Sequence, residues 1–382
     1  MRVFISAGEP SGDMHGANLI RRLRERHPQV EVTGFGGDRM TAAGADLVFP
    51  LCNFAVMGLG AVIKALPTFL RLHKLAKEEF AKRRPDVLVL IDYPGYHWWL
   101  AGAAKKAGIP VCYFVPPQIW GWARWRVHKL RRLTDRVLSS LPFEHDFFAE
   151  HGVQTELIGH PYFDELAQQR LDGDFMAAQR RQPGTIVAML PGSRKHELDY
   201  NVPSLIRAAQ IIHAKRPDVR FLAGCLKPHQ ADHVRQQLQG TNLPVEVHIG
   251  RTAEIIQLAH SCLAVSGSIS LEMLHRGKPA AILYRVFWTT RVLGKMLLKA
   301  KYITLVNLLA DRMIYPEYIS TGCLGEQLAG NVLHWLQDRA AYEEVCGQLA
   351  TLRARFGMPG ACDRAVQVIS EMAAQGSKRL AA

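Results

Sequence analysis

Three features common in other protein classes are missing from this sequence. Its seven cysteines include no Cys-x-x-Cys pair, so nothing indicates a disulfide framework or a cysteine-bound zinc site, and we expect reduced thiols in the cytoplasm. The longest uncharged run, residues 47–63, contains Pro50 and Asn53, and it is shorter than the ~20 apolar residues of a membrane-spanning helix. No segment matches the Gly-x-x-x-x-Gly-Lys-Ser/Thr loop of P-loop ATPases. We expect neither a metal nor an organic cofactor.

Acidic residues are also scarce. There are 34 Asp and Glu residues against 47 Lys and Arg residues, which gives a net charge of +13. This balance favours an acidic partner, such as nucleic acid, an anionic lipid or a phosphorylated substrate. The hydrophobic share of 48% is ordinary for a soluble globular protein, and 382 residues suffice for two domains. Residues 1–6 predict a first β-strand rather than a signal peptide.

Apolar runs and turn residues alternate along most of the chain in the order strand, helix, strand. Buried strands are predicted at residues 3–6, 30–35, 86–91, 111–115 and 136–139, and again at 185–190, 219–223, 245–249, 262–265 and 280–284. Short connections between parallel strands predict an α/β fold with two doubly wound, Rossmann-like domains. We expect domains at 1–165 and 183–345, a polar linker at 163–184, and a helical segment with a charged tail at 346–382. Ligands bind at the carboxyl ends of such strands, so both domains are expected to face one cleft.

Two small-residue turns in the second domain suit a nucleotide. Residues 266–272 read Ser-Gly-Ser-Ile-Ser-Leu-Glu and connect a strand to a helix, so backbone N–H groups there can approach a phosphate. Glu272, about one turn into the helix, can reach a ribose hydroxyl. Residues 190–194 read Leu-Pro-Gly-Ser-Arg, and the guanidinium of Arg194 suits a diphosphate. The alternative is that the first of these turns is purely structural.

Carboxylates follow two predicted strands of the first domain. Residues 8–13 read Gly-Glu-Pro-Ser-Gly-Asp, which suits sugar binding, although Ser11 or Asp13 could equally cap a helix. Asp92 stands where a buried strand ends, so it is a candidate general base, with capping of the next turn as the alternative. His97 is a candidate second base or a residue that holds Asp92 in place, and a packed histidine is the alternative.

Two further segments predict a surface function. Residues 54–72 are broadly apolar, with Lys64, Arg71 and Lys74 interleaved or following, which suits either a membrane interface or an ordinary core helix. Five of the seven tryptophans lie between residues 98 and 125, and a run of Arg and Lys residues follows. Such a region suits a lipid interface or single-stranded nucleic acid, and core tryptophans beside a solvated helix are the alternative.

Taken in order, these motifs resemble those of the lipid-A-disaccharide synthases, a family of GT-B glycosyltransferases. The matching blocks are residues 8–13, 55–58, 117–122, 141–144, 158–161, 190–194, 266–272 and 307–310. The resemblance implies an inverting, metal-free hexosyltransferase. It would transfer 2,3-diacylglucosamine from UDP-2,3-diacylglucosamine to 2,3-diacylglucosamine 1-phosphate, forming a β-1,6 disaccharide 1-phosphate and UDP. It also implies a cytoplasmic enzyme bound peripherally to the inner face of the inner membrane.

The residues and the resemblance together predict the site. We expect Asp92, His97 and Glu9 to be catalytic. The expected substrate-binding residues are Ser11, Gly12, Asp13, Met57, Gln118, Trp120, Gly192, Ser193, Arg194, Gly267, Ser268, Ser270, Glu272 and Asn307. The chain departs from the family pattern at Asp38, Gly95, His97, Ser268 and Ser320, and these departures cluster in or near the expected acceptor side.

Two other functions compete with this prediction. One is a different GT-B enzyme acting on a UDP-hexosamine, such as an epimerase or another transferase, although a soluble substrate gives the apolar segment 54–72 no purpose. The other is a nucleic-acid-binding protein, which would use the positive charge but gives Glu9, Asp92 and Glu272 no role. We therefore expect no nucleic-acid partner. A homodimer is also compatible with the sequence.

Overall fold

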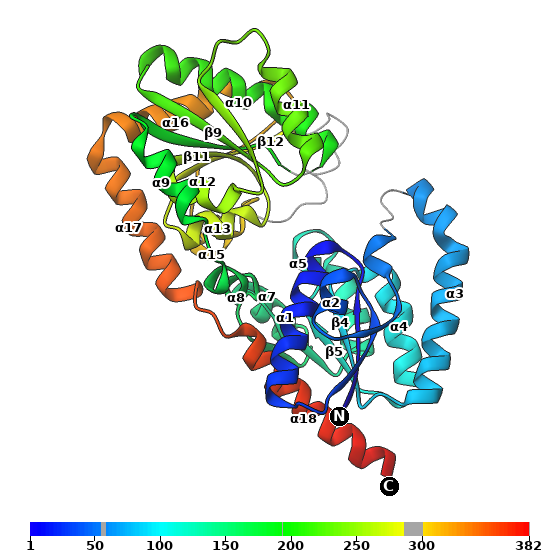
Figure 1. Ribbon diagram of the computed structural model, residues 1–382. Coiled ribbons are helices and arrows are strands. Elements are labelled where there is room, and N and C mark those ends of the chain that lie inside the picture. Colours follow the sequence, from blue (N-terminus) through cyan, green and yellow to red (C-terminus); the bar gives the residue numbers. More distant parts are fainter. Residues whose placement is uncertain (55–58, 193, 286–300, 382) are drawn as a thin grey trace. The chain divides into compact units, whose positions relative to one another are not determined.

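The computed structural model describes residues 1–54, 59–192, 194–285 and 301–381, with side chains omitted at 59–65, 195–196 and 376–381. The chain forms two compact units (Figure 1). The first comprises Met1–Glu165 together with Pro359–Ala382, and the second comprises Leu166–Met358. Met57 and Ser193, both predicted to bind substrate, lie outside the described residues.

The first unit is built on a parallel sheet whose strands lie in the order β3-β2-β1-β4-β5-β6-β7. The strands are β1 (Arg2–Ala7), β2 (Glu31–Phe35), β3 (Asp46–Phe49), β4 (Val87–Ile91), β5 (Val111–Phe114), β6 (Arg136–Ser139) and β7 (Thr155–Leu157). The helices of this unit are α1 (Pro10–Arg26), α2 (Asp38–Ala42), α3 (Leu59–Arg83), α4 (Pro94–Lys106), α5 (Ile119–Trp122), α6 (Val127–Leu133), α7 (Pro142–Glu150) and α18 (Ala361–Ala381).

The second unit has its own parallel sheet, in the order β10-β9-β8-β11-β12-β13. The strands are β8 (Thr185–Leu190), β9 (Val219–Cys225), β10 (Val245–Ile249), β11 (Ser261–Val265), β12 (Ala280–Arg285) and β13 (Glu317–Ser320). The helices are α9 (Gly173–Arg181), α10 (Lys195–Lys215), α11 (Pro228–Leu238), α12 (Thr252–Leu258), α13 (Ile269–His275), α15 (Leu305–Ala310), α16 (Gly325–Gln337) and α17 (Arg339–Phe356). Helix α8 (Tyr162–Gln168) spans the boundary between the units.

Strand β4 shows why the sequence predicts a sheet covered on both faces. All five of its residues, Val-Leu-Val-Leu-Ile, are buried. Successive side chains of a strand point to opposite faces. Accordingly Val89 packs in a core with residues of α1 and α18, whereas Leu88 and Leu90 pack in a second core with aromatic residues such as Phe4 and Tyr96. A strand buried on both faces reads as a continuous aliphatic run.

Every strand predicted from the sequence is present, and three short strands were missed. The missed strands β3, β7 and β13 all lie at a sheet edge, where partial exposure leaves no continuous apolar run to recognise. Residues 163–184, predicted to be a linker, instead hold most of α8 and all of α9. The predicted segment 346–382 is divided, because α17 belongs to the second unit and α18 to the first. The charged tail expected at the end of this segment is not separate from the helix, because α18 continues as far as Ala381.

Asp164 anchors the start of α18 to the rest of the first unit. Its buried carboxylate accepts hydrogen bonds from the backbone N–H groups of Gly360, of Ala361 at 3.3 Å and of Cys362 at 2.7 Å. These are the N–H groups that a helix start leaves without an intrahelical partner. One side chain therefore links segments nearly 200 residues apart in the sequence.

Replacing Asp164 by alanine should destabilise the first unit by roughly 2–4 kcal/mol, because several buried N–H groups lose their acceptor together. Urea unfolding followed by tryptophan fluorescence measures this, since five of the seven tryptophans lie in this unit. Asp363→Ala is the matched control, because its side chain is 61% exposed in the same helical turn. Equal losses of stability in the two variants would contradict the anchoring role.

Candidate active site

The carboxyl edge of the first sheet holds three residues with strained backbones. Asp92 and Tyr93 follow β4 with φ values of 47° and 49°, and Val115 follows β5 with a φ of 54°. Side chains other than glycine rarely adopt this left-handed region, and strain of this kind concentrates at functional sites. The two strained segments are joined, because the Asp92 N–H donates to the Val115 carbonyl at 3.1 Å. The segments that follow the neighbouring strands β4 and β5 are therefore joined at Asp92.

The Asp92 backbone is held in this strained conformation by two buried side chains. Its carbonyl accepts a hydrogen bond from the Tyr113 hydroxyl at 2.6 Å and contacts His97 Nδ1 at 2.7 Å. The other ring nitrogen of His97 lies 2.9 Å from Ser6 Oγ. Since a carbonyl can only accept, His97 Nδ1 carries the proton, and Nε2 accepts from the Ser6 hydroxyl. Burial lowers the pKa of His97 to about 3, so the ring is neutral with both nitrogens engaged.

The Asp92 carboxyl group differs from the His97 imidazole in both exposure and proton affinity. It is partly exposed, and burial raises its pKa to about 6, with a further contribution from the negative charge of Glu9. A carboxylate with a pKa near 6 is ionised at neutral pH and still holds a proton better than an ordinary aspartate. Asp92 can therefore act as a base toward a ligand, whereas the geometry of His97 suits it for holding Asp92.

The loop at residues 8–13 divides into exposed and internally bonded residues. Glu9 and Ser11 are exposed, and Gly12 is buried. The buried Asp13 carboxylate accepts from the backbone N–H groups of Gly37 at 2.9 Å and of Arg39 and Met40 at 3.1 Å. Asp13 therefore caps α2, whereas the sequence suggested a cap for the helix that contains it.

Gly8 lets this loop meet the loop after β4. A Cβ atom at Gly8 would lie 2.3 Å from the Tyr93 ring, so only glycine permits the close approach. Strands β1 and β4 are neighbours, with Ala7 paired to Ile91. Glu9 and Asp92 thus lie on loops that follow adjacent strands, which is why the charge of Glu9 affects the pKa of Asp92.

Gln118 and Trp120 follow β5 at the same edge. Gln118 is exposed, and Trp120 is partly exposed. The Trp120 indole N–H donates to Glu144 Oε1 at 3.2 Å, and its ring meets Phe143 edge-on at a centroid distance of 4.8 Å. Burial raises the pKa of Glu144 to about 8, so this carboxyl group is largely protonated at neutral pH. The sequence analysis did not assign Glu144 to the site, although residues 141–144 are one of the blocks that match the family.

In the second unit, the loop after β8 presents Arg194 to solvent. Gly192 has a φ of +96°, and a Cβ atom there would lie 2.8 Å from Glu197 Oε2. Glu197 accepts from the Arg194 N–H at 3.1 Å and lies 3.4 Å from its guanidinium. The Arg194 side chain is nevertheless 54% exposed. Its charge is therefore available to an anion.

The turn after β11 lies beside that loop, because Ala264 of β11 pairs with Leu190 of β8. No atom of the described residues lies within 4 Å of where a Cβ of Gly267 would stand, so within this part of the chain its backbone is open to a ligand. Ser268 precedes α13. The Ser270 hydroxyl, in contrast, donates to the Gly267 carbonyl at 2.9 Å and is buried, so it holds the turn together.

The remaining two predicted binding residues are buried and bonded within the unit. Glu272 accepts from Arg276 at 3.0 Å, and both side chains are at most 6% exposed. The Asn307 amide donates to the Tyr315 carbonyl at 2.8 Å and to Glu317 at 3.0 Å. Its oxygen accepts from two backbone N–H groups. Asn307 therefore organises the loop between α15 and β13.

Two other kinds of feature are absent from the described residues. No group of three or more His, Cys, Asp or Glu side chains within this part of the chain could hold a metal ion. No helix among the described residues is both long enough and apolar enough to cross a membrane.

Comparisons with known proteins agree with the fold. The UDP-GlcNAc 2-epimerase from Neisseria meningitidis bound to UDP-GlcNAc superposes with a TM-score of 0.68 and 12% identity, covering 97% of this chain and 100% of the other. MurG from Acinetobacter baumannii superposes with a TM-score of 0.60 and 12% identity, covering 97% and 99%. At such identities these structures establish the fold alone. They confirm two Rossmann-like domains of the kind found in GT-B glycosyltransferases.

Sequence comparisons are more specific. A model of the lipid-A-disaccharide synthetase family matches residues 3–361. The lipid-A-disaccharide synthase of Myxococcus xanthus (strain DK1622) is 33% identical over 380 residues, with 98% of each chain covered. That of Anaeromyxobacter sp. (strain K) is 34% identical over 368 residues, with 94% of each chain covered. Because these matches span nearly the whole length of every chain compared, this hexosyltransferase belongs to the lipid-A-disaccharide synthase family.

Proposed function

We propose that the enzyme transfers 2,3-diacylglucosamine from UDP-2,3-diacylglucosamine to 2,3-diacylglucosamine 1-phosphate. The products are the β-1,6-linked lipid A disaccharide 1-phosphate and UDP. Family membership supports the reaction. The observation that carries the mechanism is the strained, partly exposed Asp92, whose raised pKa suits a general base.

In this mechanism, Asp92 accepts the proton of the acceptor's 6-hydroxyl group. The hydroxyl oxygen forms a bond to C1 of the donor sugar as the bond between C1 and the diphosphate oxygen breaks. The configuration at C1 inverts, so one base suffices and no covalent sugar intermediate is needed. UDP departs with the bonding electron pair, and Arg194 with the backbone donors at Gly192, Gly267 and Ser268 stabilises its phosphates.

The other predicted residues divide into contact and positioning roles. We assign substrate contacts to the exposed or partly exposed Glu9, Ser11, Gln118 and Trp120. Glu272, expected from the sequence to reach the donor ribose, is buried and paired with Arg276, so we assign it a positioning role. Positioning roles fall to residues whose polar groups are bonded internally, which are Asp13, His97, Ser270 and Asn307. Such residues hold loops and strained backbone in place without contacting substrate.

A product assay tests the proposed function directly. Purified enzyme is incubated with the UDP-linked donor and the monosaccharide 1-phosphate acceptor, and the lipid products are analysed by mass spectrometry. We expect the disaccharide 1-phosphate together with one UDP per coupling event. A parallel incubation with UDP-N-acetylglucosamine alone tests for epimerase activity. Epimerised sugar without any disaccharide would contradict the proposal.

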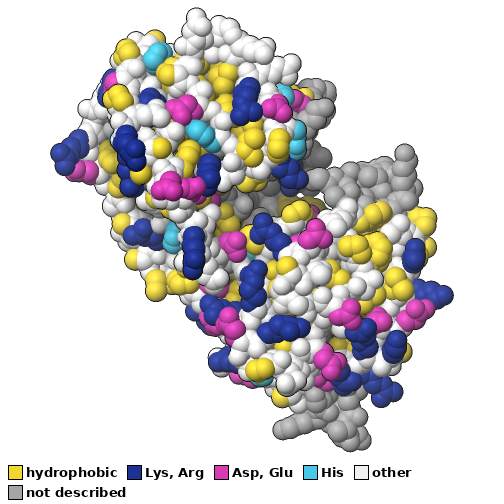
Figure 2. All heavy atoms as spheres, viewed as in Figure 1, with side chains coloured by type: hydrophobic (Ala, Val, Ile, Leu, Met, Phe, Trp, Pro, Cys, Tyr) yellow, Lys and Arg dark blue, Asp and Glu magenta, His cyan; other side chains and the backbone are white. Residues whose placement is uncertain are grey.

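We also propose that the enzyme docks peripherally on the inner face of the inner membrane through α3. Leu66 and Leu70 are 44% and 55% exposed, and Arg71 and Lys74 beside them are exposed. The opposite side of the helix is anchored, because Leu72 is fully buried in the core. Figure 2 shows hydrophobic and basic side chains interleaved over this helix. Apolar residues among cations suit an anionic lipid surface. Lys64, also assigned to this surface, lies among the side chains that are not described.

The double variant Leu66→Ser/Leu70→Ser should bind anionic vesicles at least about tenfold more weakly, because each lost leucine forfeits roughly 1.5–3 kcal/mol of burial. Vesicle flotation measures the change. Phe69→Ser is the contrasting variant, since Phe69 stacks on the buried Tyr96 at 5.5 Å and belongs to the core. It should lower the melting temperature without a specific loss of lipid binding. Unchanged flotation of the double variant would argue against docking through α3.

A further inference from the structure

The second unit contains a pocket at the edge of its sheet opposite to the nucleotide loops. Its volume is about 490 Å³. It is lined by the start of β8, the turn before β11 and the segment before β12, and Tyr342 of α17 contributes one wall. These are the amino-terminal ends of the strands, whereas Arg194 and Gly267 follow the carboxyl ends of β8 and β11. A volume of this size is typical of small-molecule sites.

The lining is basic. Arg180 and Lys278 supply its positive charge, and none of the described residues that line it is acidic. His260 also lines it, but burial lowers the pKa of this imidazole to about 4, so the ring is neutral at pH 7. The Lys278 side chain is only partly exposed, and within the described part of the chain its ammonium group makes neither a hydrogen bond nor an ion pair. Burial lowers the pKa of Lys278, and the nearby Arg180 and Arg276 contribute in the same direction. A half-buried cation among like charges is stabilised when an anion binds beside it.

Neutral hydrogen-bond donors complete the lining. Gln257 accepts from Arg276 through its amide oxygen at 3.3 Å, so its NH₂ group is left to donate. Gln182 and Thr185, whose side chains can also donate hydrogen bonds, line the pocket as well. Several donors around one ammonium group suit the oxygens of a phosphate, for which lysine serves as a point charge.

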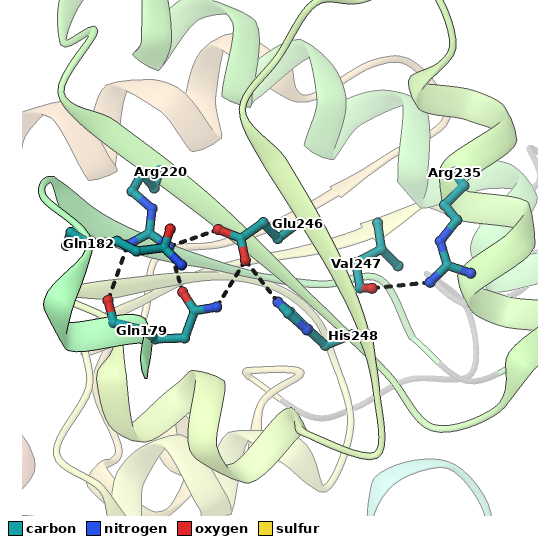
Figure 3. A network of polar contacts seen from close by, with 7 residues as sticks. All are labelled: Gln179, Gln182, Arg220, Arg235, Glu246, Val247 and His248. Carbon is teal, nitrogen blue, oxygen red and sulfur yellow. Dashed lines mark hydrogen bonds and ion pairs between the residues drawn. The ribbon is translucent and has the colours of Figure 1, made fainter. Parts of the chain in front are cut away.

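The walls of the pocket are held rigidly. Figure 3 shows the network that fixes the end of α9 to the sheet. The Arg220 guanidinium donates to the Gln179 carbonyl at 3.2 Å and pairs with Glu246 at 2.7 Å. Glu246 Oε2 also accepts from Gln179 Nε2 at 2.9 Å, and His248 Nε2 lies 3.3 Å from the same oxygen. Because Gln179 lines the pocket, this network sets the wall before any ligand arrives.

The opposite wall is equally fixed. The rings of Tyr342 and His260 are stacked with their centroids 4.1 Å apart and their planes 20° apart. The Tyr342 hydroxyl also donates to the His260 carbonyl at 3.3 Å. A ligand that enters a preformed site orders few side chains, so more of its contact energy appears as affinity.

We propose that this pocket, centred on Lys278, is a second anion site that binds a small phosphate-bearing ligand. The ligand is either inorganic pyrophosphate or an organic phosphate monoester, which share the charge and the oxygens that the lining recognises. The site uses residues of the second unit alone and none of the groups assigned to sugar transfer. Its test therefore does not depend on whether the proposed reaction is correct.

Calorimetric titration of the full-length enzyme with pyrophosphate tests the site. UDP is kept saturating so that the nucleotide loops are occupied, and ionic strength is held constant. Wild-type enzyme should bind pyrophosphate under these conditions. Lys278→Gln should bind it roughly tenfold or more weakly, as expected for a lost charged contact. Glycerol 3-phosphate in a parallel titration identifies the source, because tighter binding of the ester indicates an organic ligand.

Two further variants keep the result interpretable. Arg180→Glu reverses an exposed charge at the rim, where folding is not at stake, and it should also weaken pyrophosphate binding. Arg207→Gln removes an exposed charge of α10, outside the pocket, and should leave it unchanged. Unaltered UDP affinity in every variant shows an intact second unit. The site would be refuted if wild-type enzyme bound neither pyrophosphate nor glycerol 3-phosphate beside UDP, or if Lys278→Gln bound these ligands as tightly as the wild type.

Discussion

Replacing Asp92 by asparagine should lower kcat for disaccharide formation by roughly 10²–10⁴-fold, the usual contribution of a positioned base. Asparagine keeps the size of the side chain but cannot take the proton of the acceptor hydroxyl at neutral pH. UDP affinity should stay at the wild-type value, since the nucleotide loops belong to the other unit. Steady-state kinetics with both lipid substrates, and calorimetry with UDP, measure the two quantities.

Two variants make this prediction specific. Asp46→Asn is the same chemical change on edge strand β3, at a side chain that is 66% exposed and paired with Arg83, and it should leave kcat within about twofold. His97→Asn keeps a donor for the Asp92 carbonyl and should retain most activity. Near-normal kcat in Asp92→Asn together with an inactive His97→Asn would show that His97 is the base.

Removing the Arg194 side chain should weaken UDP binding by roughly 30–150-fold, which corresponds to ~2–3 kcal/mol for a charge-assisted contact with a diphosphate. The side chain is more than half exposed in the free enzyme and lies 3.4 Å from Glu197. Arg194→Ala should therefore cost little stability, and the loss should appear in binding. Calorimetric titration with UDP measures it.

Arg339→Ala provides the matched control, because Arg339 also pairs with a glutamate of its own helix and is 89% exposed. Its removal should change UDP affinity by less than about twofold. Titration with uridine separates two explanations of a loss in Arg194→Ala. Uridine lacks the diphosphate, so its affinity should be the same in wild type and variant. If Arg194→Ala bound UDP as tightly as the wild type, the diphosphate contact would be misassigned.

The sequence alone was enough to place Asp92 at the carboxyl edge of the sheet. Ligands of parallel sheets bind at that edge, where buried strands end. The run of aliphatic residues that ends at Ile91 predicts both the strand and its edge. What holds Asp92 could not be read in this way. The His97 contact with Ser6 joins residues 91 positions apart, and Tyr113 looks like any other residue of a buried strand. Contacts of this kind depend on the register of three strands, which composition and periodicity do not encode.

The roles of individual polar residues were harder to predict than their positions. Asp13 lies in a loop of glycines and acids, but its partners are the backbone N–H groups of residues 37, 39 and 40. Asn307 is of a residue type that often binds ligands. It is nevertheless fully buried, and its side-chain amide makes four hydrogen bonds inside its own unit. A polar side chain in a motif can either bind a substrate or hold a loop in place. Only its hydrogen-bond partners in the three-dimensional structure distinguish the two roles.

The pH dependence of one ratio tests the central claim most directly. The ratio is kcat/KM of wild type divided by kcat/KM of Asp92→Asn. The acceptor's phosphate monoester also titrates near pH 6, and its effect on kcat/KM is the same in both enzymes and cancels in the ratio. Only the carboxylate form of Asp92 accepts a proton, and its pKa is raised to about 6. The ratio should be constant above about pH 7 and fall roughly tenfold per pH unit below about pH 6. A ratio that stays constant between pH 5 and pH 8 would contradict Asp92 as the general base.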